Sequence, residues 1–86
     1  MAVYKIEVKR SALKDLGKLD KRTIHQIMSK MESLAKNPRP VQSLKLSGSE
    51  HSYRLRVGKY RLLYQINETA KIVIVFAIGH RKDIYK

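Results

Sequence analysis

The fold is decided by two segments late in the sequence, YRLRVGKYRLLYQI (residues 53–66) and KIVIVFAIGHRKDIY (residues 71–85). Both are rich in β-branched and aromatic residues, and the first begins by alternating apolar with polar side chains at the period of a β-strand. Gly58 and Lys59 form a two-residue link with glycine first, which is typical of a tight hairpin turn. The sequence therefore predicts three consecutive antiparallel strands, at about residues 51–57, 60–66 and 71–78.

The same alternation assigns two arginines to one face of the sheet. Tyr53, Leu55 and Val57 share one side of the first strand, so Arg54 and Arg56 leave the other side together. The last strand is instead an almost unbroken run of Ile, Val, Phe and Ala, which is typical of a strand with both faces covered. We expect this strand to lie in the interior of the sheet.

Two amphipathic helices are predicted between residues 11 and 37. Ser11 is the expected N-cap of the first and Asp20 of the second, because both side chains can accept a hydrogen bond from a free backbone N–H group. Apolar residues recur at three- and four-residue steps, as Leu13, Leu16 and Leu19 and then as Ile24, Ile27, Met28, Met31, Leu34 and Ala35. The second helix should end near Asn37, because Pro38 disfavours helical backbone before it.

The remaining segments complete one small domain. Residues 3–8 alternate apolar with other side chains and are predicted to form a half-buried strand. Residues 41–50 are polar and are expected to be a connector, which Leu44 and Leu46 attach to the core. The prediction is a single α+β domain over residues 1–86. In it, an N-terminal strand, a two-helix hairpin and a three-stranded antiparallel meander form a four-stranded, mostly antiparallel sheet.

The composition is strongly basic. Nineteen Lys and Arg residues against seven Asp and Glu give a formal net charge of +12 over 86 residues. Such an excess favours polyanionic partners, because each neutralised phosphate releases condensed counterions. The chain has no cysteine, which excludes disulfides and thiolate sites, and no apolar run long enough to span a membrane. We expect a cytoplasmic protein without a membrane partner, a metal or a cofactor.

Common catalytic motifs are absent: the sequence has no GxxxxGKS/T phosphate loop, no GxGxxG, no HExxH and no GxSxG elbow. What remains is a candidate site made of Arg54, Arg56, Arg61, His80, Arg81 and Tyr85, with Lys45, Lys59 and Lys82 as further RNA-binding charges. Arginine forks match phosphate oxygens and stay charged, and tyrosine can stack on a splayed base. By themselves these residues fit either cleavage of a phosphodiester or simple binding of nucleic acid.

The ordered set YRLR, KYRLLYQI and an apolar strand closing in IGHRKDIY resembles the RelE/ParE superfamily of small toxins, in particular its RelE-type messenger-RNA interferases. The resemblance covers nearly the whole chain, and its specific part follows residue 50. It implies the RelE-like microbial ribonuclease fold. It also implies a metal-independent endoribonuclease that cuts messenger RNA in the ribosomal A site by attack of the 2′-OH and so inhibits translation.

The resemblance implies a role for each matching residue. Arg54 and Arg56 stand where RelE toxins carry basic residues, one of which is proposed to take the proton from the 2′-OH. Arg61 matches the arginine that stabilises the transition state, and Arg81 matches the one that assists the leaving 5′-oxygen. Tyr85 matches the tyrosine that orients the substrate nucleotide or stacks on it.

One departure from the family pattern affects the general base. The best-known members have lysines at the positions of Arg54 and Arg56, and lysine can lose a proton whereas arginine effectively cannot. Either Arg56 acts through its charge while Tyr85 or His80 moves protons, or this member is slower. His80 is a candidate shuttle because its ordinary pKa lies near neutrality. The alternative is a strand-end histidine that hydrogen-bonds the backbone.

The resemblance also implies partners. These are a cognate acidic antitoxin that wraps the toxin and blocks its site, the ribosome with its messenger RNA, and operator DNA contacted only through the toxin–antitoxin complex. The charge of +12 independently favours an acidic partner. Two alternatives stay open: a ParE-like poison of DNA gyrase, and a catalytically weak nucleic-acid-binding member of the fold. A phosphate-directed cluster argues against the gyrase poison, which has no use for one.

Overall fold

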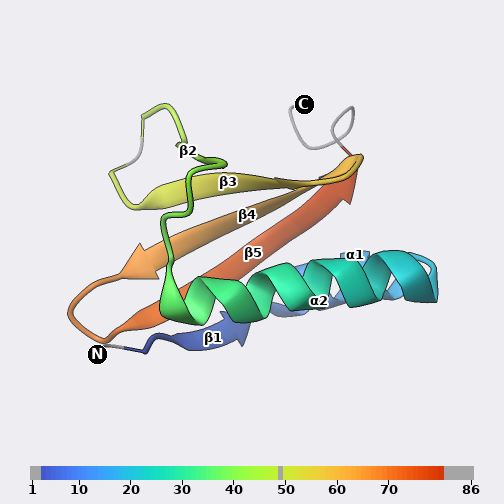
Figure 1. Ribbon diagram of the computed structural model, residues 1–86, viewed down its shortest axis with the longest axis horizontal. Helices are drawn as coiled ribbons and strands as arrows, with labels where there is room; N and C mark the ends of the chain where they lie inside the picture. Colours follow the sequence, from blue (N-terminus) through green and yellow to red (C-terminus); the bar gives the residue numbers. More distant parts are fainter. Residues whose placement is uncertain (1–2, 49, 81–86) are drawn as a thin grey trace.

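The computed structural model describes residues 3–48 and 50–80, and in this part of the chain five strands form one sheet beside two helices (Figure 1). The elements are β1 (Lys5–Val8), α1 (Arg10–Gly17), α2 (Lys21–Lys36), β2 (Ser43–Lys45), β3 (Ser52–Val57), β4 (Tyr60–Asn67) and β5 (Ile72–His80). The strand order is β1-β5-β4-β3-β2, with β1 parallel to β5 and the other pairs antiparallel. The predicted α+β class is confirmed.

The predicted number of strands is wrong, because part of the expected connector joins the sheet. β2 pairs antiparallel with residues 53–55 of β3 and forms one edge. A turn prepares this pairing, since the backbone N–H of Ser43 donates to the Pro40 carbonyl at 2.9 Å. Three residues are too few to show a period of two, so the pattern did not reveal this strand.

The three-stranded meander is confirmed. Val57 pairs with Tyr60, which leaves Gly58 and Lys59 as the two-residue link. Gly58 has φ 60°, in the left-handed region that glycine enters without a steric penalty. β5 lies between β4 and β1, so its interior position is also confirmed. Only one of its faces is fully buried, however, because Ile74 and the other outward-facing residues remain half-exposed.

The helices cover one face of the sheet, and their caps differ from the prediction. α1 begins after Lys9 rather than after Ser11, whose hydroxyl donates instead to the Phe76 carbonyl at 3.1 Å. Ala12 and Leu16 are its buried residues, whereas Leu13 is 53% exposed. A stripe with four-residue spacing therefore faces β5, and the small side chain of Ala12 lets the helix approach closely.

α2 follows the prediction more closely. Asp20 holds the N-cap position, although its side chain makes no capping hydrogen bond, and the helix ends at Lys36 before Pro38. The buried stripe is Ile27, Met31 and Leu34. Met28 lies beside this stripe and is 46% exposed. Neither helix in the described ranges is long and apolar enough to cross a membrane.

The core lies between the helices and one face of the sheet. Leu55, Leu62, Tyr64, Val73 and Val75 fill it from the strands and are each no more than 2% exposed. The side chains that alternate with these residues project from the opposite face of the sheet, which we call the open face. From β3 and β4 it receives Ser52, Arg54, Arg56, Arg61, Leu63 and Gln65. The fold thus presents a continuous surface on the side of the sheet away from α1 and α2.

Candidate functional site

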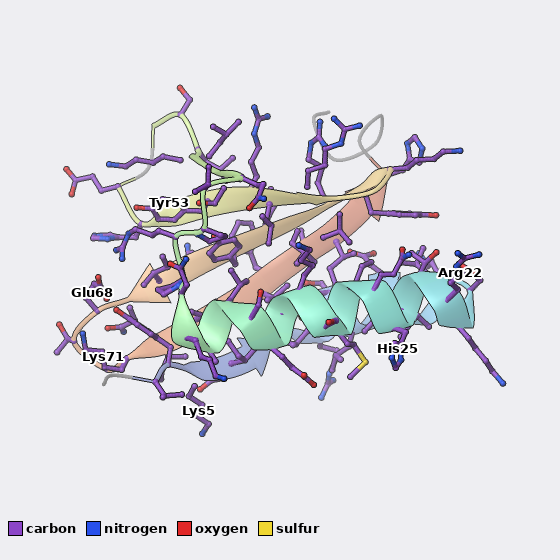
Figure 2. The ribbon with its side chains drawn as sticks, viewed as in Figure 1. Lys5, Arg22, His25, Tyr53, Glu68 and Lys71 are labelled. Carbon is purple, nitrogen blue, oxygen red and sulfur yellow. The ribbon has the colours of Figure 1, made fainter. Side chains whose placement is uncertain are left out.

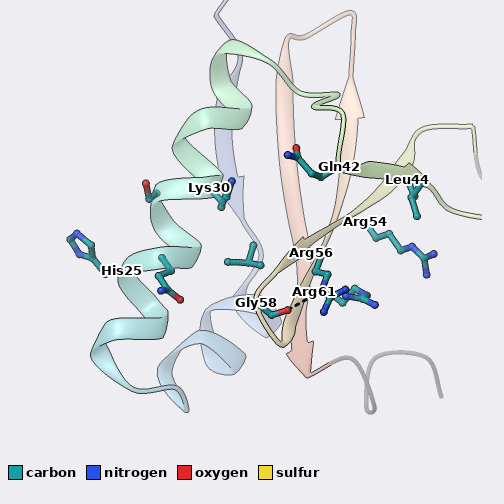
Figure 3. Close-up of a pocket in the computed structure, with 11 residues that line it drawn as sticks. His25, Lys30, Gln42, Leu44, Arg54, Arg56, Gly58 and Arg61 are labelled. Atoms are coloured by element: carbon teal, nitrogen blue, oxygen red, sulfur yellow. Dashed lines mark hydrogen bonds between the residues drawn. The ribbon is translucent and has the colours of Figure 1, made fainter.

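The strand register brings three of the predicted arginines onto the open face. Arg56 lies directly opposite Arg61, and Arg54 lies opposite Leu63, two residues further along β4. Opposed residues in an antiparallel pair have Cβ atoms about 4.5–5.5 Å apart and point to the same face. Figure 3 shows the three side chains together on the side of the sheet away from α2. We call this group the arginine cluster.

The cluster is held in place by the local fold. Two like charges opposite each other repel, so the pair needs support. Arg56 receives it from the hairpin turn, because its Nε donates to the Gly58 carbonyl at 3.1 Å (Figure 3). Arg61 is partly buried and its Nη1 atom is inaccessible to solvent. Arg56 is exposed, so it is the partly desolvated Arg61 that attracts an anion more strongly than a fully exposed charge would.

A cavity of about 850 Å³ adjoins the cluster, and all three arginines contribute to its lining. α2 and the segment around β2 contribute to its lining with His25, Gln26, Ser29, Lys30, Gln42 and Leu44. None of these six residues was predicted from the sequence to belong to a site. The four on α2 recur at four-residue steps on one polar face, which is the signal that a search for a shared helix face would have used.

His80 does not join the arginine cluster. It lies opposite Tyr60 in the register, and the two rings meet edge to face with centroids 5.7 Å apart. Its neighbour Gly79 is the residue opposite Arg61. Successive side chains of a strand alternate between its two faces. His80 therefore projects from the same face as Tyr60, and not from the open face.

The predicted RNA-binding lysines are divided. Lys59 is exposed in the turn between the strands that carry Arg56 and Arg61. Lys45 lies opposite Tyr53, so its side chain projects from the face of the sheet opposite to the arginine cluster. Lys82 lies outside the described residues, as do Arg81 and Tyr85.

A second polar group, which no sequence pattern predicted, connects the segment after α2 with the β4–β5 turn. Arg39 donates from Nε to the Tyr53 hydroxyl at 3.1 Å and pairs through Nη2 with Glu68 at 2.9 Å. The Tyr4 hydroxyl also donates to Glu68, and Lys71 Nζ lies 3.9 Å from the same carboxylate. Figure 2 shows Tyr53, Glu68 and Lys71 at one end of the molecule. These contacts tie four separate segments together, because Tyr4 lies before β1 and Tyr53 lies in β3.

The contacts shift the ionisation of both central groups. Hydrogen bonds from Tyr4 and then Arg39 lower the pKa of Glu68, because they stabilise its charged form. The bond to Tyr53, followed by that to Glu68, raises the pKa of Arg39 against the opposing effect of burial. Glu68 therefore stays ionised at neutral pH. Over residues 3–48 and 50–80, no group of three His, Cys, Asp or Glu side chains could hold a metal ion.

The known proteins to which the chain is similar are toxins of one kind. The family model of the ParE toxin of the type II toxin–antitoxin system parDE matches residues 6–85. The chain is similar to a Methanocaldococcus jannaschii protein named as the toxin RelE1, with 31% identity over 86 residues and 96% of each chain covered. It is also similar to the mRNA interferase toxin RelE of Escherichia coli K12, with 31% identity over 81 residues, 92% of this chain and 84% of that protein.

A solved structure shows the same fold. It is the archaeal RelE-RelB complex from Pyrococcus horikoshii OT3, which the chain matches with a TM-score of 0.84 at 25% identity. The match covers 96% of this chain and 99% of that one.

Proposed function

The chain belongs to the RelE/ParE family of toxins from type II toxin–antitoxin systems, and from this premise we propose that it is a ribosome-dependent endoribonuclease. Its substrate is messenger RNA in the ribosomal A site. Cleavage of a translated message stops protein synthesis, and this is the basis of toxicity. A relative that is named as an mRNA interferase supports the proposal at 31% identity.

The observation that carries the proposal is the pairing of Arg56 with Arg61 across β3 and β4. In the proposed reaction the 2′-oxygen attacks phosphorus, the bond to the 5′-oxygen breaks, and a 2′,3′-cyclic phosphate and a 5′-hydroxyl are formed. Negative charge accumulates on the phosphoryl oxygens in the transition state. Two guanidinium groups fixed on one face stabilise that charge without reorganisation, which is the largest contribution that a site of this composition can make.

The proton transfers require groups other than the described arginines. Arg56 and Arg61 remain charged, so they cannot accept the proton of the 2′-OH. His80 shares a face with Tyr60 and not with the cluster, which leaves Tyr85 as the protein's candidate for this step. We assign Arg81 to the leaving 5′-oxygen, as the family resemblance implies: its charge stabilises that oxygen as the bond breaks, and solvent supplies the proton, because arginine does not give one up. The ribosome supplies the alignment of the 2′-OH that this small site lacks.

The proposed protein partner is an acidic antitoxin. With a net charge of +12, the chain attracts an acidic protein by its overall field, which speeds encounter and sets orientation. An antitoxin segment placed over the arginine cluster would compete with the phosphate of the message. Contact with operator DNA is then left to the antitoxin within the complex.

The test is to induce the protein in cells and to map cuts in translated messages by primer extension, with and without ribosomes in a parallel reaction in vitro. We expect growth arrest, cuts in translated messages and little cleavage of naked RNA. The variant with Arg61→Ala and Arg81→Ala should lose both effects while keeping its circular dichroism spectrum. The matched control is Arg10→Ala with Arg22→Ala, which removes the same charge from the helices and should remain toxic.

A ParE-like action on DNA gyrase is the second candidate, because the matching family model is that of a ParE toxin. Such a poison would not need the arginine cluster. If the double variant stays toxic while gyrase becomes trapped on DNA, the ribonuclease proposal is wrong.

A further inference from the structure

A second cavity lies at the far end of the open face. Its volume is about 430 Å³, and its lining includes His51, Gln65, Asn67, Thr69 and Ile74. Gln65 and Ile74 lie opposite each other in the β4–β5 register, on the face opposite to the core. The cavity is therefore on the same side of the sheet as the arginine cluster.

A short path joins this cavity to the arginine cluster. Gln65 follows Arg61 by four residues of β4, which is about 13 Å at the rise of a strand. Leu63 lies halfway between Arg61 and Gln65, and Arg54 lies opposite Leu63. A cationic side chain is therefore present between Arg61 and the cavity. An extended single strand whose phosphates contact Arg56 and Arg61 would continue along the face toward Gln65. Phosphate contacts fix the position of a strand, whereas sequence is read by contacts to bases.

The lining of the cavity suits a nucleobase. Ile74 is half-buried and offers an apolar surface for the flat face of a base. His51 supplies an imidazole ring, and histidine is one of the side chains on which unstacked bases stack. Gln65 and Asn67 supply amides that can pair with hydrogen-bonding groups on a base edge. This combination of a stacking ring and amides is how proteins recognise single-stranded RNA.

The walls of the cavity are fixed before any ligand arrives. Asn67 Oδ1 accepts a hydrogen bond from the backbone N–H of Ala70 at 2.9 Å, which closes the β4–β5 turn. The backbone N–H of Ile66 donates to the His51 carbonyl at 3.0 Å and holds the two sides together. The acidic rim residue, Glu68, is paired with Arg39 at 2.9 Å, so its charge is compensated. A rigid site loses little entropy on binding.

We propose that this cavity is a base-recognition subsite for single-stranded RNA. His51 stacks on a base that flanks the cleaved linkage, and Gln65 hydrogen-bonds its edge. The inference rests on the proposed function, since it places the scissile phosphate at the arginine cluster. It adds that the chain itself selects among messages, through a nucleotide outside that cluster.

The first test measures binding without cleavage. The isotope-labelled full chain is titrated with short single-stranded oligonucleotides of adenine, uracil or cytosine, and amide shifts are followed by NMR. We expect shifts at His51, Gln65 and Ile74, and one base bound more tightly than the others. His51→Ala should weaken that binding at least fivefold, roughly the smallest effect of losing one stacked base. Gln65→Glu should change which base is preferred, while Ser33→Ala, an exposed neutral change on α2, should alter neither.

Shifts confined to the arginine cluster, or equal affinity in wild type and His51→Ala, would overturn the subsite. The second test maps cuts in translated messages for wild type and for both variants. A loss of base preference at one flanking position supports the subsite, and an unchanged preference contradicts it. If wild type cuts no message, the proposed function fails, and the binding titration still decides whether the cavity recognises a base.

Discussion

Tyr64 is the largest of the fully buried side chains, and its hydroxyl joins the core to the segment after α2. The hydroxyl donates to the Pro38 carbonyl at 2.7 Å. Burial raises the pKa of Tyr64, because the charged form would lose its hydration. Its ring also stacks on Tyr53, with centroids 5.9 Å apart.

Tyr64→Phe should lower the free energy of unfolding by roughly 1–2 kcal/mol, because it leaves a buried carbonyl without its partner. Urea unfolding followed by circular dichroism measures the change. Tyr60→Phe is the matched control, since it removes the same atom from a half-buried ring, and it should cost less. Equal stability of Tyr64→Phe and wild type would show that the hydroxyl does not stabilise the fold.

At the scale of single residues, the alternation of side chains along β5 does not predict the face from which His80 projects. Val73 and Val75 face the core, so strict alternation would send Ile78 and His80 to the open face. The register between β4 and β5 shifts at Leu63/Tyr64, and after this bulge Ile78 is buried instead. His80 therefore changes face. The regular β3–β4 register explains why Arg54 and Arg56 share a side as predicted and why Arg61 joins them there.

At the scale of elements, the turn between β3 and β4 sets the geometry of the site. Gly58 holds the left-handed conformation that closes the turn, and its carbonyl holds Arg56. Gly58→Ala should lower the free energy of unfolding by about 1–2 kcal/mol, the cost of placing a side chain at this φ. It should also slow cleavage, because the partner of Arg56 moves with the turn.

Thermal unfolding and primer extension check these two effects. The control is Gly17→Ala at the end of α1, where an added Cβ meets open space and φ lies outside the left-handed region. It should leave stability equal or slightly higher. A Gly58→Ala variant as stable and as active as wild type would show that the turn does not position Arg56.

The sequence predicted the long elements better than the short ones. Helical periodicity located α2, an unbroken apolar run located β5, and the turn at Gly58 placed β4 directly after β3. β2 escaped because its pairing with β3 depends on the path of the chain after Pro40 rather than on any local pattern. The cavity beside α2 escaped for a related reason, because residues of α2, β2 and the β3–β4 hairpin are brought together there only by the folded chain.

At the scale of the whole molecule, Glu68 makes stability depend on pH. Its pKa is lowered in the folded protein, so the fold gains stability above the unfolded value of 4.5 and loses that gain as pH falls through the folded pKa. Glu68→Gln should therefore be less stable than wild type at pH 7, and the difference should shrink in acid. Urea unfolding at neutral and acidic pH measures both variants. A difference that stays constant with pH would contradict this role for the carboxylate.

The parallel pairing of β1 with β5 delays completion of the sheet until late in translation. A ribosome must pass the codon for His80 before β5 can insert between β1 and β4, although β1 was made first. Until then α1 has no strand to pack on, and the β3–β4 hairpin is only marginally stable by itself. Pairings so distant in the sequence also form slowly. On the proposed function, a nascent chain would therefore not yet harm the ribosome that is making it, and the proposed antitoxin, if already present, would have time to bind before the surface is complete.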